Sequence, residues 1–155
     1  MEEKTLIFVK PDGVQRMLVG RILSRFESKG LVLQGLKMMQ LTEAKAREHY
    51  AVHEGKPFYE GLIQYVTSGP IVAMVFSGVR AIEVCRTLMG ATFGWQAQPG
   101  TIRGDFGISG SFNLIHGSDA PESAAKEIPL YFSPEELVDW APASKPWIYD
   151  LEDDL

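Results

Sequence analysis

Two short runs of consecutive apolar residues constrain the fold of this chain most. Residues 5–9 read Thr-Leu-Ile-Phe-Val and residues 71–76 read Ile-Val-Ala-Met-Val-Phe, and proline and glycine lie close to each run. Runs of this length, rich in strand-forming residues and bounded by turn residues, predict buried strands. A sheet built on such strands needs other elements to cover it.

The intervening segments follow helical spacing. Apolar residues recur at helical intervals over 18–26 and predict a helix that ends at Gly30, followed by a strand over 31–39. Thr42 predicts the N-cap of a short helix, and further helices are expected after Pro57 and over 79–89.

The last third of the chain supplies one more strand and two helix starts. Residues 113–116 predict the fourth strand, while 119–122 and 133–136 resemble capping boxes that open helices. Three helical connections between four strands predict an α+β fold, a ferredoxin-like βαββαβ sandwich with a four-stranded antiparallel sheet covered by helices. The glycine-rich stretch 90–112 is expected to be a long functional loop.

Composition limits the kind of protein. The 155 residues are 45% hydrophobic, which is typical of one globular domain, so we expect a single domain over 1–155 with an acidic tail from about residue 150 to 155. The lone Cys85 favours a reducing compartment, and we expect a cytoplasmic protein without signal peptide or membrane span. A net charge of -5 argues against an obligate nucleic-acid partner, although a few converging cations can still hold a phosphate.

His116 is the most suggestive residue for chemistry. It ends the predicted fourth strand just before a helix start, and an imidazole with a pKa of about 6.5 can act as a nucleophile at neutral pH. Glu127 could orient the ring directly or through Ser118. A histidine in a core or turn remains the alternative.

Three cations are placed so that they could meet in one cleft. Lys10 ends a strand, Arg86 lies in a helix and Arg103 lies in the glycine-rich loop. Glycines on both sides of Arg103 would let backbone and guanidinium approach a ligand together. Neither a P-loop nor a Rossmann glycine motif is present. Three unrelated surface cations are the alternative.

Other residues suggest different chemistry. His49 and His53 have the spacing that can place two imidazoles on one metal, but a third ligand is missing nearby, so a helix face is the alternative. Phe58 and Tyr59 could stack on a base or simply fill a core. A metal-dependent hydrolase using His49, His53 and His116, or a binding module without activity, therefore remains open.

Six motifs together resemble the nucleoside diphosphate kinase family, in order and over nearly the whole chain. The motifs are Lys10-Pro11-Asp12-Gly13-Val14, His49-Tyr50, Lys56-Pro57-Phe58, Ser68-Gly69-Pro70, Pro99-Gly100-Thr101-Ile102-Arg103-Gly104-Asp105 and Asn113-Leu114-Ile115-His116-Gly117-Ser118-Asp119.

The resemblance implies a ping-pong phosphotransferase. It would move the γ-phosphate of a nucleoside triphosphate, mainly ATP, to a nucleoside diphosphate through a phosphohistidine on His116, with Mg²⁺ bound with the nucleotide and with broad base and sugar tolerance. Glu127 and Ser118 would be its orienting partners, and no protein side chain is assigned to the metal. The implied nucleotide-binding residues are Lys10, Tyr50, Phe58, Leu62, Arg86, Thr92, Arg103 and Asn113, with Phe58 and Leu62 as the base clamp.

The family assembles as hexamers or tetramers. The aromatic C-terminal segment, with Trp140, Trp147 and Tyr149, resembles that of hexameric members, so we expect a homohexamer. The chain departs from the family pattern at 93–95, where Asn-Pro is common, at 110–112, where Gly-Arg or Gly-Lys is frequent, and at Ala120, where serine is common. A glycine at position 94 is expected to make its loop more mobile than a proline would.

Overall fold

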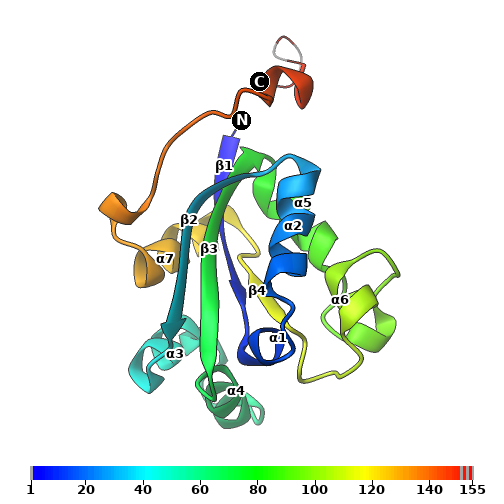
Figure 1. Ribbon diagram of the computed structural model, residues 1–155. Helices are drawn as coiled ribbons and strands as arrows, with labels where there is room; N and C mark the ends of the chain where they lie inside the picture. The colour runs from blue at the N-terminus through cyan, green and yellow to red at the C-terminus, as the bar shows by residue number, and fades with distance from the viewer. Residues whose placement is uncertain (1, 151, 153, 155) are drawn as a thin grey trace.

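The protein is built around one four-stranded sheet. The computed structural model describes residues 2–150, 152 and 154, and its strands lie in the order β2-β3-β1-β4 with every neighbouring pair antiparallel (Figure 1). This order confirms the predicted ferredoxin-like α+β fold. The strands are β1 (Glu2–Val9), β2 (Val32–Gln40), β3 (Pro70–Val79) and β4 (Ile115–Gly117).

The two apolar runs form the central strands β1 and β3. Their side chains alternate between two hydrophobic cores: Leu6 and Phe8 belong to one, Ile7 and Val9 to the other. Both faces of the sheet are covered, which explains why the runs are continuously apolar rather than alternating.

Helices cover both faces of the sheet. On one side lie α2 (Val19–Lys29) and α5 (Ala81–Met89), and on the other lie α3 (Glu43–His49), α4 (Tyr59–Val66) and α7 (Pro121–Tyr131). The shorter pieces are α1 (Pro11–Gln15), α6 (Ile102–Phe106), η1 (Ala51–His53), η2 (Gly94–Gln96), η3 (Pro134–Glu136) and η4 (Lys145–Trp147). Across the described residues, no helix is both long and apolar enough to cross a membrane.

Several predicted helix ends are confirmed. Gly30 closes α2 in the left-handed conformation, with φ of 106°, which glycine adopts without steric cost. Thr42 caps α3, because its hydroxyl accepts a hydrogen bond from the Lys45 amide at 3.1 Å. The capping box at Ser133 is also present, although it opens only the short η3.

Other boundaries differ from the prediction. The expected capping box at 119–122 is wrong, because Ala120 is the N-cap and has no side-chain oxygen, while the Asp119 carboxylate accepts instead from the Ser123 hydroxyl at 2.5 Å. The helix that follows runs past the expected end to Tyr131. Val79, expected in a helix, is the last residue of β3, and the strand expected over 113–116 begins only at Ile115.

The glycine-rich stretch 90–112 contains more structure than predicted. It carries η2 and α6, each too short to show periodicity in the sequence. The Thr101 side chain caps α6 by accepting from the Gly104 amide at 3.0 Å, and Asp105 pairs with Arg25 at 2.6 Å. Arg103 therefore sits on a helix and is buried.

The C-terminal segment follows the β2 side of the sheet toward the start of β1 (Figure 1). Trp140 donates its indole N–H to the Leu33 carbonyl at 2.9 Å, and the Tyr149 hydroxyl accepts from the Val79 amide at 3.1 Å. Two of the aromatics expected to serve neighbouring subunits thus pack on their own chain, whereas Trp147 is 91% exposed. The expected acidic tail at 150–155 lies partly outside the described residues.

Candidate active site

His116 is held by the edge strand β4. It pairs with Phe8 of β1, and its ring stacks on the Phe8 ring with the centroids 4.9 Å apart. The side chain is 18% exposed, so a ligand can reach it although most of the ring is enclosed. A short strand with one buried face thereby fixes the imidazole against the sheet.

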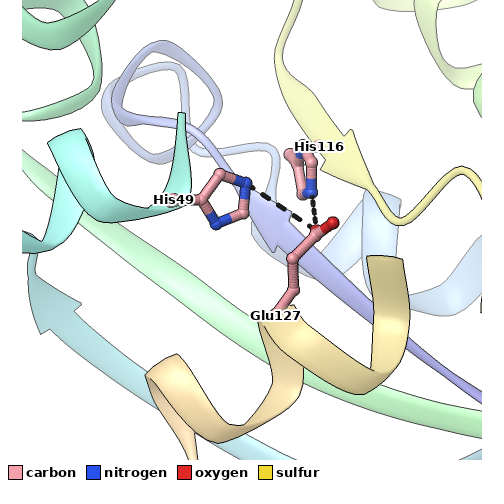
Figure 2. Close-up of side chains that lie close together, drawn as sticks. All are labelled: His49, His116 and Glu127. Carbon is pink, nitrogen blue, oxygen red and sulfur yellow. Dashed lines mark hydrogen bonds and ion pairs between the residues drawn. The ribbon is translucent and has the colours of Figure 1, made fainter. Parts of the chain in front are cut away.

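Glu127 of α7 points at this ring (Figure 2). Its Oε1 atom is hydrogen-bonded to His116 Nε2, and Ser118 Oγ donates to the same oxygen at 3.3 Å. Burial raises the pKa of Glu127, and this effect is opposed by His49 and by the Ser118 hydroxyl. A carboxylate facing Nε2 places the imidazole proton on that nitrogen, which leaves the lone pair on Nδ1.

His49 joins this pair from α3 (Figure 2). Its side chain is only 2% exposed, its Nε2 lies 3.7 Å from Glu127 Oε1, and its Nδ1 lies 2.8 Å from the Tyr131 hydroxyl. Burial, and then the neighbouring His116, lower the pKa of His49 to about 3, so the ring is neutral at neutral pH.

The sequence points to His49 through its spacing to His53 and its place directly before Tyr50, with a helix face as the alternative. Tyr131 carries no such signal. No spacing rule connects either residue to Glu127, because α3 and α7 meet only in the folded chain.

Lys10, Arg86 and Arg103 surround the imidazole. Burial is the largest cause that lowers the pKa of His116 below its ordinary value. The positive charges of these three residues lower it further, and the charge of Asp119 opposes them. A low pKa keeps the ring unprotonated and hence nucleophilic at neutral pH.

The hydrogen-bond partners of these cations are neutral. Lys10 Nζ donates to Asn113 Oδ1 at 2.8 Å, and Arg86 donates to the Gly117 carbonyl at 3.2 Å. Arg103 donates to three backbone carbonyls at distances of 2.7 to 3.1 Å. Over the part of the chain that the structure describes, none of the three forms an ion pair with a carboxylate.

Lys10 and Arg103 are buried, which makes their charges costly until an anion arrives, whereas Arg86 is exposed. Burial, followed by the charge of Arg103, lowers the pKa of Lys10 to about 7. Burial, followed by the charge of Arg86, lowers the pKa of Arg103 to about 10. Desolvated cations with neutral partners are a site for a multiply charged anion.

Tyr50, Asn113 and Thr92 line the same region. The Tyr50 hydroxyl is buried and has no hydrogen-bond partner among the described residues, and burial raises its pKa, so it keeps its proton. Asn113 donates from Nδ2 to the Thr92 carbonyl at 3.2 Å, which ties the strand entry to the loop after α5. A buried hydroxyl without a partner is a donor that a ligand can use.

Phe58 and Leu62 begin α4. Phe58 is its N-cap and 53% exposed, and Leu62 lies one turn later on the same face. The structure thus places an exposed ring beside an aliphatic side chain, while Tyr59 is buried in the core.

His53 lies outside the three-residue group that could hold a metal among the described residues. His53 lies 3.1 Å from Lys56 Nζ and packs against Phe58. The group that could hold a metal among the described residues consists of His49, His116 and Glu127, whose ligand atoms lie within 4.8 Å of one another.

The departures from the family pattern add exposed aromatic rings. Phe93 stacks on Trp95 with 6.4 Å between centroids. A Cβ at Gly94 would lie 2.4 Å from the Gly107 carbonyl oxygen, so the backbones pack directly together at this position. Phe112 packs edge-on against Tyr65 at 5.1 Å.

Comparison with known proteins places this geometry in context. A family model described as nucleoside diphosphate kinase matches residues 3–137. The nucleoside diphosphate kinase of Carboxydothermus hydrogenoformans is 56% identical over 148 residues, covering 96% of this chain and 99% of the relative, and that of Synechococcus elongatus is 54% identical with the same coverage.

Solved structures agree with the sequence relatives. The nucleoside diphosphate kinase of Halobacterium salinarum, solved in complex with CDP, superposes with a TM-score of 0.94 at 50% identity over 96% of this chain and 99% of that one. A nucleoside diphosphate kinase family protein from Babesia bovis gives 0.91 at 46% identity over 95% and 99%.

Proposed function

The chain belongs to the nucleoside diphosphate kinase family, and we propose that His116 carries the phosphoryl group between its two nucleotide substrates. As a member of this family the protein is a nucleotide-binding phosphotransferase that acts on nucleoside triphosphates and diphosphates. The arrangement around the ring carries the assignment of His116. The Glu127 carboxylate is hydrogen-bonded to Nε2, and three cations without carboxylate partners lie near the ring.

The proposed reaction has two matching half-steps. The Nδ1 lone pair of His116 attacks the γ-phosphorus of the triphosphate, the bond to the β,γ-bridging oxygen breaks, and the diphosphate leaves with that electron pair. The Nε2 proton stays in its hydrogen bond to Glu127, whose negative charge stabilises the phosphorylated ring. A terminal oxygen of a second diphosphate then attacks the phosphorus and returns the electron pair to Nδ1.

Positioning and charge account for most of the catalysis. Phosphoryl transfer spreads negative charge over the transferred oxygens and needs little covalent help. Lys10, Arg86 and Arg103 supply fixed positive charge at the ring, and the Tyr50 hydroxyl supplies a buried donor. Lys10, Arg103 and Tyr50 are already buried and held in place, so they need little reorganisation during the reaction, whereas Arg86 is exposed.

Nucleotide recognition rests on the remaining site residues. Asn113 and Thr92 are proposed to contact the phosphates and sugar, and Phe58 with Leu62 to flank the base. Stacking does not read base edges, so broad base tolerance follows. The CDP complex of the Halobacterium salinarum relative supports a nucleotide at this site.

Mg²⁺ is proposed to arrive with the nucleotide. The cluster of His49, His116 and Glu127 offers two nitrogens and one oxygen, whereas Mg²⁺ prefers oxygen ligands and binds largely through substrate phosphates. When bound, the ion would neutralise charge on the phosphate oxygens.

A labelling experiment tests the proposal. The protein is incubated with Mg²⁺ and γ-labelled ATP, and we expect an acid-labile, alkali-stable adduct that added GDP discharges. His116→Ala should abolish the adduct, while His53→Gln, which alters a histidine outside the cluster, should retain it. Labelling that survives His116→Ala moves the nucleophile elsewhere, and EDTA-sensitive phosphate release without an adduct favours a hydrolase.

We also propose that the chain forms one domain and assembles as a cytoplasmic homohexamer. Support comes from Leu36 and Met38, exposed on the edge strand β2, and from Trp147 on the C-terminal segment, because exposed apolar side chains of this size are usually covered by a partner. Light scattering at micromolar protein should give the mass of six chains, and a mass of one or two contradicts the hexamer.

A further inference from the structure

The backbone just before His116 takes an unusual conformation. Leu114 has a φ of 73°, and the Ile115 amide donates to the Asn113 carbonyl at 2.8 Å. These two features define a three-residue γ-turn with positive φ, which is rare and strained for a residue with a side chain. Such a turn persists only where its surroundings hold it in place.

Arg103 holds the two outer residues of this turn. Its Nε donates to the Asn113 carbonyl at 3.0 Å and one terminal nitrogen donates to the Ile115 carbonyl at 2.7 Å. The flat guanidinium therefore spans the turn and fixes the separation of its ends.

The start of α1 holds the central residue. The Lys10 amide donates to the Leu114 carbonyl at 2.8 Å, and the Asp12 Oδ2 atom accepts from the Leu114 amide at 3.1 Å. Gly13 allows this approach, because a Cβ there would lie 3.2 Å from the Leu114 carbonyl oxygen and 2.5 Å from Val9 Cγ1. Both backbone polar groups of the strained residue are thus bound by residues two positions apart in the chain.

Asp12 is itself oriented from the other side. Its Oδ1 atom accepts a hydrogen bond from the Tyr65 hydroxyl of α4. The Lys10 ammonium lies 5.5 Å from the centre of the Tyr65 ring, and Lys10 Nζ also donates to the Asn113 side chain. One carboxylate therefore links α4, the γ-turn and, through the turn, a side chain proposed to bind nucleotide.

We propose that Asp12 is a positioning residue for phosphoryl transfer, which holds the γ-turn at Leu114 in the conformation that presents Asn113 and His116 to the nucleotide. This inference rests on the proposed function of His116. No hydrogen bond or ion pair joins Asp12 to the imidazole among the described residues, so Asp12 acts on His116 through the turn. Since β4 starts at Ile115, the dihedral angles of Leu114 set the direction in which the chain enters the strand that carries His116.

The geometry distinguishes this role from that of a general charge. An asparagine at position 12 can accept from the Leu114 amide with its oxygen and donate to the Tyr65 oxygen with its nitrogen, so it preserves both links without the charge. Alanine preserves neither. Phenylalanine at position 65 frees the carboxylate from α4 but leaves its bond to the turn.

The test measures the rate of His116 phosphorylation in full-length protein. Asp12→Ala, Asp12→Asn, Tyr65→Phe and the control Glu136→Ala are mixed with saturating Mg²⁺ and γ-labelled ATP and quenched at short times. Glu136 is a matched control because its carboxylate also accepts from a backbone amide, that of Ser133 at 2.9 Å, far along the chain from the turn. ADP affinity is measured by calorimetry and folding by circular dichroism.

We expect a graded result. Asp12→Ala should phosphorylate at least 10-fold more slowly while its ADP dissociation constant changes less than about threefold, because misplacing a reacting group costs rate more than binding. Tyr65→Phe should be two- to fivefold slower, and Asp12→Asn and Glu136→Ala should stay within twofold of the parent.

Several results overturn the proposal. The proposal is refuted if a folded Asp12→Ala protein is phosphorylated at the parental rate. It is also refuted if Asp12→Asn is as slow as Asp12→Ala, because the charge rather than the two hydrogen bonds would then matter. Should Asp12→Ala fail to fold, a parental rate in Tyr65→Phe refutes it. Absence of any adduct in the parent protein instead refutes the proposed function itself.

Discussion

Replacing Tyr50 by phenylalanine should make the empty protein more stable and the nucleotide complex weaker. The Tyr50 hydroxyl is buried and has no hydrogen-bond partner among the described residues. A buried polar group in this state costs about 1–3 kcal/mol of folding free energy. Removing the oxygen therefore removes a penalty from the free protein and a donor from the complex.

The size of both effects follows from this one atom. For a chain of this length about 1 kcal/mol corresponds to roughly 2–4 °C in Tm, so Tyr50→Phe should raise the Tm of the free protein by at least a few degrees. A hydrogen bond to a charged phosphate contributes about 1.5–3 kcal/mol, so ADP affinity should fall roughly 10- to 150-fold.

Differential scanning fluorimetry with and without Mg²⁺ and ADP measures both quantities in one assay. Tyr149→Phe is the matched control, since the Tyr149 hydroxyl accepts from the Val79 amide at 3.1 Å and lies away from His116. Its loss should lower the Tm and leave the ADP-induced shift unchanged. A Tyr50→Phe protein that is less stable than the parent, or that keeps the full ADP-induced shift, refutes the reasoning.

Four further changes probe other parts of the chain. Burial lowers the pKa of Lys10 in the free protein to about 7, so its charge is lost as pH rises through that value and kcat/KM should fall above about pH 7. In a pH profile, Lys10→Gln should flatten this alkaline limb. A limb that stays unchanged in Lys10→Gln assigns the titration to another group. Gly104→Ala would place a Cβ 1.8 Å from the Gln98 carbonyl oxygen, so α6 must shift and activity should fall more than 10-fold. Its control, Gly61→Ala, lies on an open helix surface. This variant should be more stable by about 0.5–1 kcal/mol in thermal unfolding and should keep its activity. His49→Phe should slow adduct formation more than 10-fold, and a parental rate would reduce His49 to a packing role.

The fold was predictable where short-range patterns decide it. The apolar runs and the helical spacing before Gly30 reflect burial within single elements, and both are confirmed. The predicted ends of helices and strands were wrong where contacts between distant parts of the chain determine them. Val79 stays in β3 because it pairs with Glu2 of β1, and Asp119 serves Ser123 rather than a helix start.

Candidate site residues can be selected from the sequence by residue type, but the contacts that connect them cannot. Their places at strand ends and on the following helix predict His116, Lys10 and Glu127 as candidates, whereas the contacts of His49 and Asp12 depend on neighbours that only folding supplies. Asp12 binds the amide of Leu114, which lies 102 positions further along the chain. No periodicity or local spacing in the sequence encodes such a contact. In the structure, the positive φ of Leu114 marks the turn, and the residues that hold it can then be identified.

Charge placement resolves the conflict between an acidic chain and an anionic substrate. The net charge of -5 belongs to the whole sequence, but no carboxylate pairs with the charges of Lys10, Arg86 and Arg103, because carbonyl and amide oxygens accept their hydrogen bonds. A carboxylate partner would have stabilised the buried charges of Lys10 and Arg103, and the same interaction would have weakened their attraction for phosphate. The candidate site thus keeps positive charge that a polyphosphate could neutralise, and burial together with the same charge lowers the pKa of His116.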